Sequence, residues 1–185
     1  MKLPILRIIF IIIVFSIISC KNEVKTQKEE IITPLMNKYL SITVNAKVLE
    51  DDKFQLYFSE EITGQYHPED IVEVNVKGQD QLQNIVFNLP ERIYPIKIRL
   101  DVGTRKFETP INIEEIIFST GAKQKSFKGV ELLEYFKPNK YLEKQTTGNN
   151  FDRKHIDGVY DPFFISINVG SIVDNIFSEK SDENH

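Results

Sequence analysis

The sequence predicts an all-β protein folded as an antiparallel two-sheet β-sandwich of jelly-roll type. Three observations support this prediction. From Ser41 onward, apolar and polar residues alternate in short runs, which is typical of strands with one buried face. Gly, Pro, Asn or Asp separates most of the runs. The chain also has 13 Phe and many Ile and Val, which pack well on a pleated surface. About eight strands without intervening helices favour two sheets packed face to face.

The first two strands are predicted to form a hairpin. Each has an apolar residue at every second position, with Ile42, Val44 and Ala46 in the first and Phe54, Leu56 and Phe58 in the second. The charged residues 50–53 between them are expected to form the turn.

Further strands are expected in six later runs. The clearest is 96–102, where Ile96, Ile98, Leu100 and Val102 alternate with charged residues, so one face is expected to be buried and the other exposed to solvent. The remaining runs are 71–76, 82–89, 111–118, 132–136 and 163–167. Residues 131–136 are alternatively a helical turn. Residues 169–177 have apolar residues at helical spacing and predict a short terminal helix or tail, followed by a disordered end.

Composition and charge limit the classes of protein to which this chain can belong. Its 185 residues are enough for one ordinary domain with a core of its own. The net charge of −4 gives no basic field for a phosphate backbone, so no nucleic acid partner is expected. The single cysteine, Cys20, excludes an internal disulfide and a cysteine metal cluster.

The amino terminus is predicted to be a secretory signal. Lys2 and Arg7 precede the apolar run 8–18, which is the order found in signal peptides. The alternative is an uncleaved membrane helix. That helix needs roughly 20 apolar residues and would have to include Arg7.

Ile17-Ile18-Ser19-Cys20 resembles the lipobox of bacterial lipoproteins, with Ser19 at the small position and Cys20 at the lipidated one. The resemblance implies cleavage before Cys20 and attachment of lipid to its sulfur. We therefore expect a signal peptide at 1–19, a lipidated cysteine with a flexible tether at 20–38, a sandwich at 39–168, and a short helix and tail at 169–185. Anchoring in the outer membrane of the cell envelope is expected, with the leaflet left open.

No arrangement in the sequence forms a catalytic signature. The nearest group is Asp152, His155, Asp157 and Asp161, which could bind a metal or support acid–base chemistry. Glycine and proline mark the same stretch as turns, where Asp is favoured for backbone bonding, so turn chemistry is the preferred interpretation. Glu50, Asp51 and Asp52 could similarly hold Ca²⁺, but a hairpin turn is preferred there. No cofactor is expected.

Tyrosines are the candidate ligand-binding residues. Most are out of phase with the predicted core or lie in loops, and exposed tyrosines offer flat amphipathic platforms for sugar rings or protein partners. The alternative is packing at the rim of the core with the hydroxyl groups in water. The candidates are Tyr57, Tyr66, Tyr94, Tyr141 and Tyr160.

Residues 83–164 resemble extracytoplasmic domains of bacterial envelope proteins that accompany surface-polysaccharide assembly. The segments that carry the resemblance are 85–90 (IVFNLP), 98–103 (IRLDVG), 136–141 (FKPNKY) and 160–164 (YDPFF). These domains look like carbohydrate-binding-module or galactose-binding-like sandwiches, and the family assigns no functional residues. The leading hypothesis is a non-catalytic, lipid-anchored sandwich that binds a glycan or an envelope partner. The alternatives are an accessory subunit of an envelope complex and, third, a hydrolase.

Overall fold

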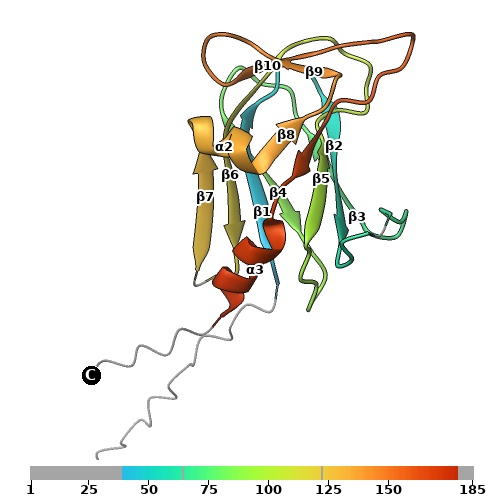
Figure 1. Cartoon of the computed structure of the whole chain (residues 1–185). Helices are drawn as coiled ribbons and strands as arrows, with labels where there is room; N and C mark the ends of the chain where they lie inside the picture. Colours follow the sequence, from blue (N-terminus) through green and yellow to red (C-terminus); the bar gives the residue numbers. More distant parts are fainter. Residues whose placement is uncertain (1–38, 64, 122, 179–185) are drawn as a thin grey trace, which may run out of the picture. The chain divides into compact units, whose positions relative to one another are not determined.

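The structure is a computed structural model that describes residues 39–63, 65–121 and 123–178. The signal peptide predicted at 1–19, the tether at 20–38 with Cys20, and the end of the tail lie outside these residues. The described strands form two antiparallel sheets (Figure 1). The all-β, two-sheet sandwich predicted from the sequence is therefore confirmed.

The first sheet has the strand order β4-β1-β6-β10-β9, and β7 also pairs with β6. Its strands are β1 (Ser41–Lys47), β4 (Gln83–Asn88), β6 (Ile111–Ser119), β7 (Gln124–Lys128), β9 (Leu142–Lys144) and β10 (Asn150–Arg153). The second sheet has the order β3-β2-β5-β11-β8. It consists of β2 (Asp52–Ser59), β3 (Ile71–Val76), β5 (Lys97–Asp101), β8 (Phe136–Pro138) and β11 (Phe163–Ser166).

The core lies between the two sheets and is built by the alternation seen in the sequence. In β1, and in β2 as far as Phe58, every second side chain is buried and the others face outward. Fully buried phenylalanines fill much of the interlayer space, among them Phe54, Phe87, Phe118 and Phe164. Outward-facing side chains of each sheet are therefore the ones available to a ligand.

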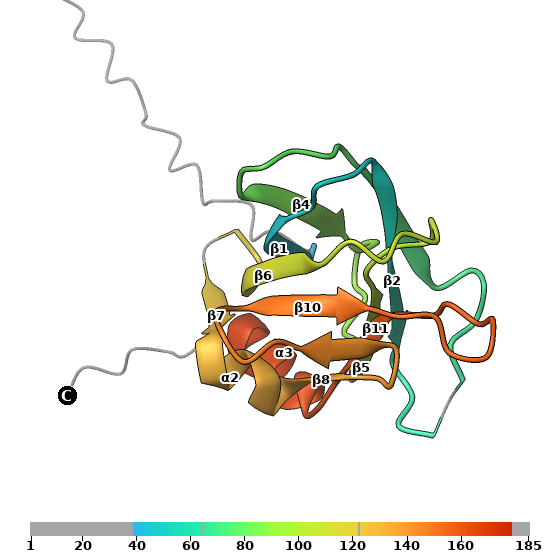
Figure 2. The same cartoon turned by 90° about the horizontal axis from the view of Figure 1, so that it is seen from above.

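Two short helices complete the core at the side where β7 lies (Figure 2). The predicted terminal helix is confirmed as α3 (Val169–Phe177), which buries Val169, Ile172, Val173 and Ile176. The strand predicted at 132–136 is wrong, and the helical alternative holds. α2 (Gly129–Tyr135) buries Leu132, and the chain passes directly from this helix into β8 at the buried Phe136. Among the described residues, no helix is long and apolar enough to span a bilayer.

The predicted hairpin between the first two strands is wrong. β1 pairs with β4 and β6 in the first sheet, whereas β2 pairs with β3 and β5 in the second. Alternation shows that each strand has one buried face. Two such strands can be neighbours in one sheet or can lie in opposite sheets with the core between them, and the alternation is the same in both cases. Residues 48–51 therefore connect the layers.

Short strands escaped the sequence prediction. β7, β8, β9 and β10 contain three to five residues each, and β7 has a single buried side chain, Phe127. Runs of this length carry too few alternations to be recognised.

A buried ion pair joins the two sheets. Asp52 begins β2 and Arg153 ends β10, and both side chains are fully buried. Arg153 Nη1 donates to Asp52 Oδ2 at 2.6 Å and to the Val102 carbonyl oxygen, while Nε donates to the Thr109 carbonyl oxygen. Asp52 Oδ1 accepts bonds from three backbone N–H groups, those of residues 53, 104 and 105. The pair thus fixes the connection after β5.

Asp52→Ala is expected to lower the free energy of unfolding by about 3–5 kcal/mol, because it leaves the Arg153 guanidinium buried without its counter-charge. Urea denaturation followed by circular dichroism measures the change. Asp51→Ala is the matched control, since the Asp51 side chain is half exposed where it pairs with Lys77, and a much smaller loss is expected. Equal losses for the two variants would contradict the prediction.

Candidate functional site

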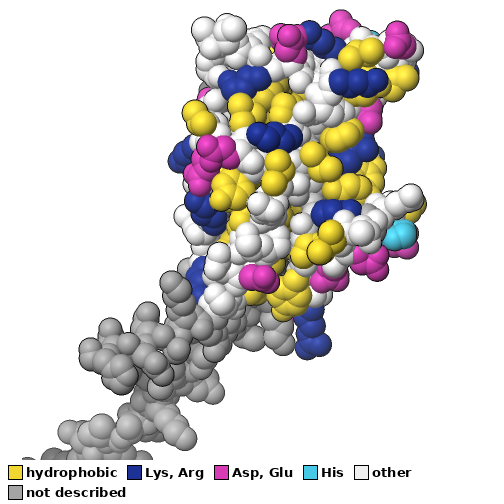
Figure 3. Space-filling view, in the orientation of Figure 1, with side chains coloured by type: hydrophobic (Ala, Val, Ile, Leu, Met, Phe, Trp, Pro, Cys, Tyr) yellow, Lys and Arg dark blue, Asp and Glu magenta, His cyan; other side chains and the backbone are white. Residues whose placement is uncertain are grey.

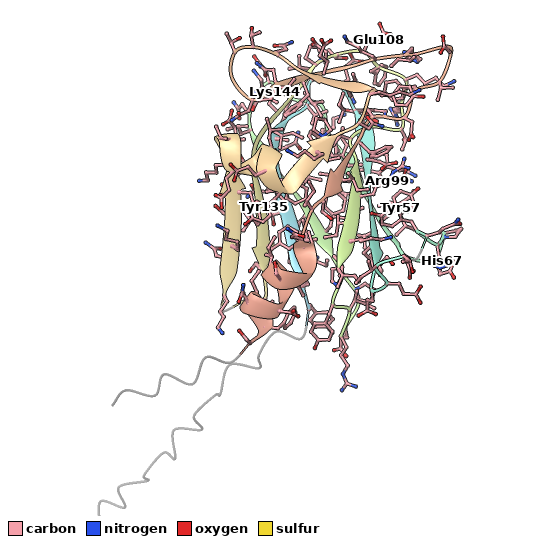
Figure 4. All side chains as sticks on the ribbon, viewed as in Figure 1. Tyr57, His67, Arg99, Glu108, Tyr135 and Lys144 are labelled. Atoms are coloured by element: carbon pink, nitrogen blue, oxygen red, sulfur yellow. The ribbon has the colours of Figure 1, made fainter. Side chains whose placement is uncertain are left out.

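The outer face of the second sheet brings polar and aromatic side chains into register. Neighbouring strands place Tyr57 of β2 beside Arg99 of β5, and Arg99 beside Ile165 of β11. The adjacent row contains Asp101 and Phe163. These side chains share one face because alternate residues of a strand point the same way. Figure 4 shows Tyr57 and Arg99 next to each other.

Arg99 is the centre of this face. Its Nε and Nη2 donate to the two carboxylate oxygens of Asp101 at 2.6 and 2.8 Å, and Nη2 also donates to Asp161 Oδ1 at 2.5 Å. The two-pronged contact with Asp101 fixes the plane of the guanidinium. Nη1 has no hydrogen bond to any described residue and remains available as a donor.

Aromatic rings frame the guanidinium. The Arg99 Cζ atom lies 3.8 Å from the centre of the Phe163 ring and 5.6 Å from that of Tyr57, both within range of cation–π attraction. Tyr66, in the loop between β2 and β3, lies 6.1 Å from Tyr57 between ring centres. Lys97 Nζ lies over the Tyr66 ring. The side chains are thereby held in fixed positions before any ligand arrives.

Tyr57, Tyr66 and Arg99 line a hollow of about 270 Å³ on this face, which we call the Tyr57 hollow. The Tyr66 hydroxyl oxygen is buried and has no hydrogen-bond partner within the described part of the chain. A buried hydroxyl without a partner costs free energy. Because this hydroxyl has no exposed surface, the polar group that the hollow offers to a ligand is the Arg99 guanidinium. The hollow therefore combines two aromatic rings with hydrogen-bonding groups.

Burial and neighbouring charges shift the pKa values of the ionisable groups at the hollow. Burial raises the pKa of Asp101, and the hydrogen bonds from Arg99 offset only part of the rise. For Arg99, burial lowers the pKa, but the hydrogen bond and charge of Asp101, together with Asp161, raise it above its ordinary value. Burial also raises the pKa of Tyr57 and of Tyr66. At neutral pH the hollow presents a guanidinium cation and two neutral phenols.

The five candidate tyrosines do not share one surface. Tyr57 and Tyr66 lie together at the hollow. Tyr94 is exposed and packs edge-on against Phe177 of α3. Tyr141 was expected to be exposed, but its side chain is buried, with 9% exposure. Tyr160 is partly buried, and its hydroxyl donates to the Phe107 carbonyl oxygen.

The four candidate metal-binding residues point to different partners. Asp152 accepts a bond from Gln145, His155 Nδ1 lies 2.9 Å from a Glu108 carboxylate oxygen, and Asp161 binds Arg99. Asp157 has a left-handed backbone (φ 53°) in the turn closed by Ile156 and Val159. Within the described residues, no three side chains of His, Cys, Asp or Glu gather as a metal site. The arrangement is that of turn residues.

The acidic residues considered for Ca²⁺ also separate. Glu50 accepts a bond from Thr109, Asp51 pairs with Lys77, and Asp52 pairs with the buried Arg153. Their side chains therefore serve three different structural contacts.

Sequence reasoning missed three residues of the site. The sequence places Arg99 and Asp101 on the solvent-exposed face of a strand and Phe163 at the start of another strand, and it indicates no binding role for any of them. The sequence does contain one signal, because Arg99 and Asp101 are two positions apart and therefore share a face. Their proximity to Tyr57 and Asp161 depends on strand pairing, which the sequence does not reveal.

Comparisons with protein-family models, with curated proteins and with solved structures find no match to this chain. The resemblance to carbohydrate-binding sandwiches and to the lipobox therefore remains a prediction from the sequence.

The Tyr160 hydroxyl is expected to make the fold sensitive to alkali. Burial is the main cause that raises its pKa from 10.0 to about 12. Below pH 10 the phenol is protonated in both states, so its stabilising effect is complete. Between pH 10 and about 12 only the unfolded phenol ionises readily, and this stability is lost as the pH rises.

The free energy of unfolding, measured against pH for the natural chain and for Tyr160→Phe, tests this. The loss of stability over that window should be smaller in the variant, which has no phenol to ionise. Parallel curves for the two proteins would show that Tyr160 is not responsible.

Proposed function

We propose that this chain is a non-catalytic, lipid-anchored protein of the bacterial cell envelope that binds a saccharide at the Tyr57 hollow. The observation that carries the proposal is the hollow itself, in which two tyrosines and an arginine meet on the open face of a sheet. Sugar rings have apolar C–H faces and polar hydroxyl edges. A site that recognises them needs flat apolar rings beside hydrogen-bonding groups.

The side chains at the hollow supply both requirements. Tyr57 offers a ring face, and its position is held from one side by Arg99. Arg99 Nη1 is free to donate to a sugar hydroxyl, while Asp161, whose side chain is 39% exposed, is able to accept from one. The ion pairs and ring contacts fix these groups beforehand, so little rotamer freedom is lost on binding.

The carboxylates near the hollow favour binding over catalysis. Asp101 uses both oxygens on Arg99, and Asp161 uses one. Carboxylates committed to a guanidinium are poorly suited to act as general acids or bases. Hydrogen bonding to saccharide hydroxyls makes no such demand.

Tyr57→Ala and Arg99→Ala are each expected to weaken saccharide binding by about tenfold or more, corresponding to about 1.4 kcal/mol. A glycan array identifies the ligand, and calorimetry on the natural chain and the variants measures the affinities. Tyr94→Ala is the matched control, because Tyr94 is an exposed tyrosine that packs on Phe177 instead.

Full affinity in both hollow variants would rule out this site. Absence of any saccharide binding, together with a membrane protein captured by crosslinking, would instead favour an accessory subunit of an envelope complex.

The lipid anchor is proposed from the sequence Ile17-Ile18-Ser19-Cys20. Lipidation adds roughly 0.8 kcal/mol of membrane affinity for each buried methylene, so two or three acyl chains hold a protein stably in a bilayer. Such an anchor would keep the sandwich at the envelope.

Cys20→Ser is expected to abolish incorporation of a radiolabelled fatty acid, since the chain has no second cysteine to accept the lipid. The variant should accumulate as a precursor or appear in the soluble fraction. Ser19→Ala keeps a small residue before the cysteine and should retain the label. Labelling that persists in Cys20→Ser would refute the anchor.

A further inference from the structure

The outward row that contains Tyr57 and Arg99 continues across the second sheet. Strand pairing places Ile165 of β11 beside Arg99, and Lys137 of β8 beside Ile165. The Ile165 side chain is exposed, at 41%, and so is Lys137. Hydrophobic and basic side chains are interspersed on this side of the molecule (Figure 3). The row therefore presents an aromatic ring, a guanidinium, an aliphatic side chain and an ammonium group in that order.

The charge along this row is uneven. At Arg99, one cation is matched by the two carboxylates of Asp101 and Asp161, so the side of the row where these carboxylates lie disfavours an anionic group. Lys97, two residues before Arg99 on β5, adds a cation on the side of Arg99 away from Asp101. Lys137 forms no ion pair with any described residue, so its ammonium group is available to an anion. Adjacent strands are about 4.8 Å apart, which puts Lys137 about 9 to 10 Å from Arg99 across two strand spacings.

The row is longer than the hollow, so a ligand that uses all of it has to be a chain. The Tyr57 hollow has room for a single sugar ring stacked beside Arg99. Ile165 continues the apolar surface toward β8 and can support the C–H face of the next ring. An acidic group on this second ring would contact Lys137 and would lie away from the carboxylates beside Arg99.

We propose that the second sheet binds a linear saccharide chain laid across its strands, in which a neutral unit stacked at Tyr57 is followed by an acidic unit at Lys137. This inference rests on the proposed function, because it takes the Tyr57 hollow as the saccharide site. It adds the class of ligand, a heteropolysaccharide whose acidic and neutral units alternate, and it assigns Lys137 as the residue that recognises the acid.

The test uses the full chain in mild detergent and three oligosaccharides of equal length. Hyaluronan hexasaccharide alternates glucuronate with N-acetylglucosamine, chitin hexasaccharide is neutral, and hexagalacturonate carries an acid on every unit. Calorimetry is expected to rank hyaluronan first. The neutral chain lacks a partner for Lys137, and the fully acidic chain places a carboxylate against Asp101 and Asp161.

Lys137→Gln is expected to weaken binding of the hyaluronan oligosaccharide about two- to fivefold, the range of an exposed ion pair, and to leave chitin binding unchanged. The salt dependence of hyaluronan binding should fall in the same variant. Lys53→Gln is the matched control. Lys53 lies on the same sheet and is already paired with Glu73 at 3.0 Å, so the preference for hyaluronan should remain.

The outcomes separate this inference from the proposed function. Equal binding of hyaluronan and chitin, or a Lys137→Gln variant with unchanged affinity for hyaluronan, would overturn the role of Lys137. If Tyr57→Ala still lost chitin binding in that case, the saccharide site would stand. Failure of every saccharide to bind would overturn both proposals.

Discussion

The buried contact between Asp52 and Arg153 is the constraint on which the rest of the structure depends. It joins the start of β2 in the second sheet to the end of β10 in the first, with both side chains excluded from solvent. A buried ion pair is favourable only when its geometry is good and its remaining donors and acceptors are paired. Three backbone N–H groups and two backbone carbonyl oxygens supply most of those partners. The loops that carry them are thus tied to one position between the sheets.

This constraint extends to the candidate site through β5. Arg153 binds the Val102 carbonyl oxygen, one residue beyond Asp101, and Asp52 binds the N–H of Thr104. Gly103 lies between them with φ of 130°. A Cβ atom there would come within 2.4 Å of Arg153 Nη1 and 2.6 Å of Asp52 Oδ2, so only glycine fits. The end of β5 is therefore rigid, and Asp101 is held where it can orient Arg99.

Local patterns in the sequence predict where strands and helices form, but they do not predict which strands pair with each other. Alternation located β1, β2 and β5, and helical spacing located α3 at its observed bounds. The same alternation could not place β1 and β2 in different sheets, because a strand with one buried face fits either layer. Two of the candidate tyrosines, Tyr57 and Tyr66, do lie at one hollow. Arg99 escaped notice because its partners Asp161 and Phe163 are more than sixty positions away and meet it only through the pairing of β5 with β11.

The two arginines show how position decides between structural and binding roles. Arg153 and Asp52 are both fully buried, and the Asp52 carboxylate already accepts four hydrogen bonds. Arg153 Nη2 has no partner among the described residues, but it is buried, so a ligand on the surface does not reach this pair. The Arg99 side chain is 25% exposed and keeps one free donor, while Asp161 beside it has one oxygen without a partner among the described residues. The difference follows from strand parity. Arg153 shares the inward face of β10 with Phe151, whereas Arg99 lies between the buried Ile98 and Leu100 and so faces outward. Gly103, two residues after Asp101, leaves room for the Arg153 guanidinium. Residues 99–103 therefore contact the buried ion pair through the Val102 carbonyl oxygen and also supply Arg99 and Asp101 to the outer face of the sheet.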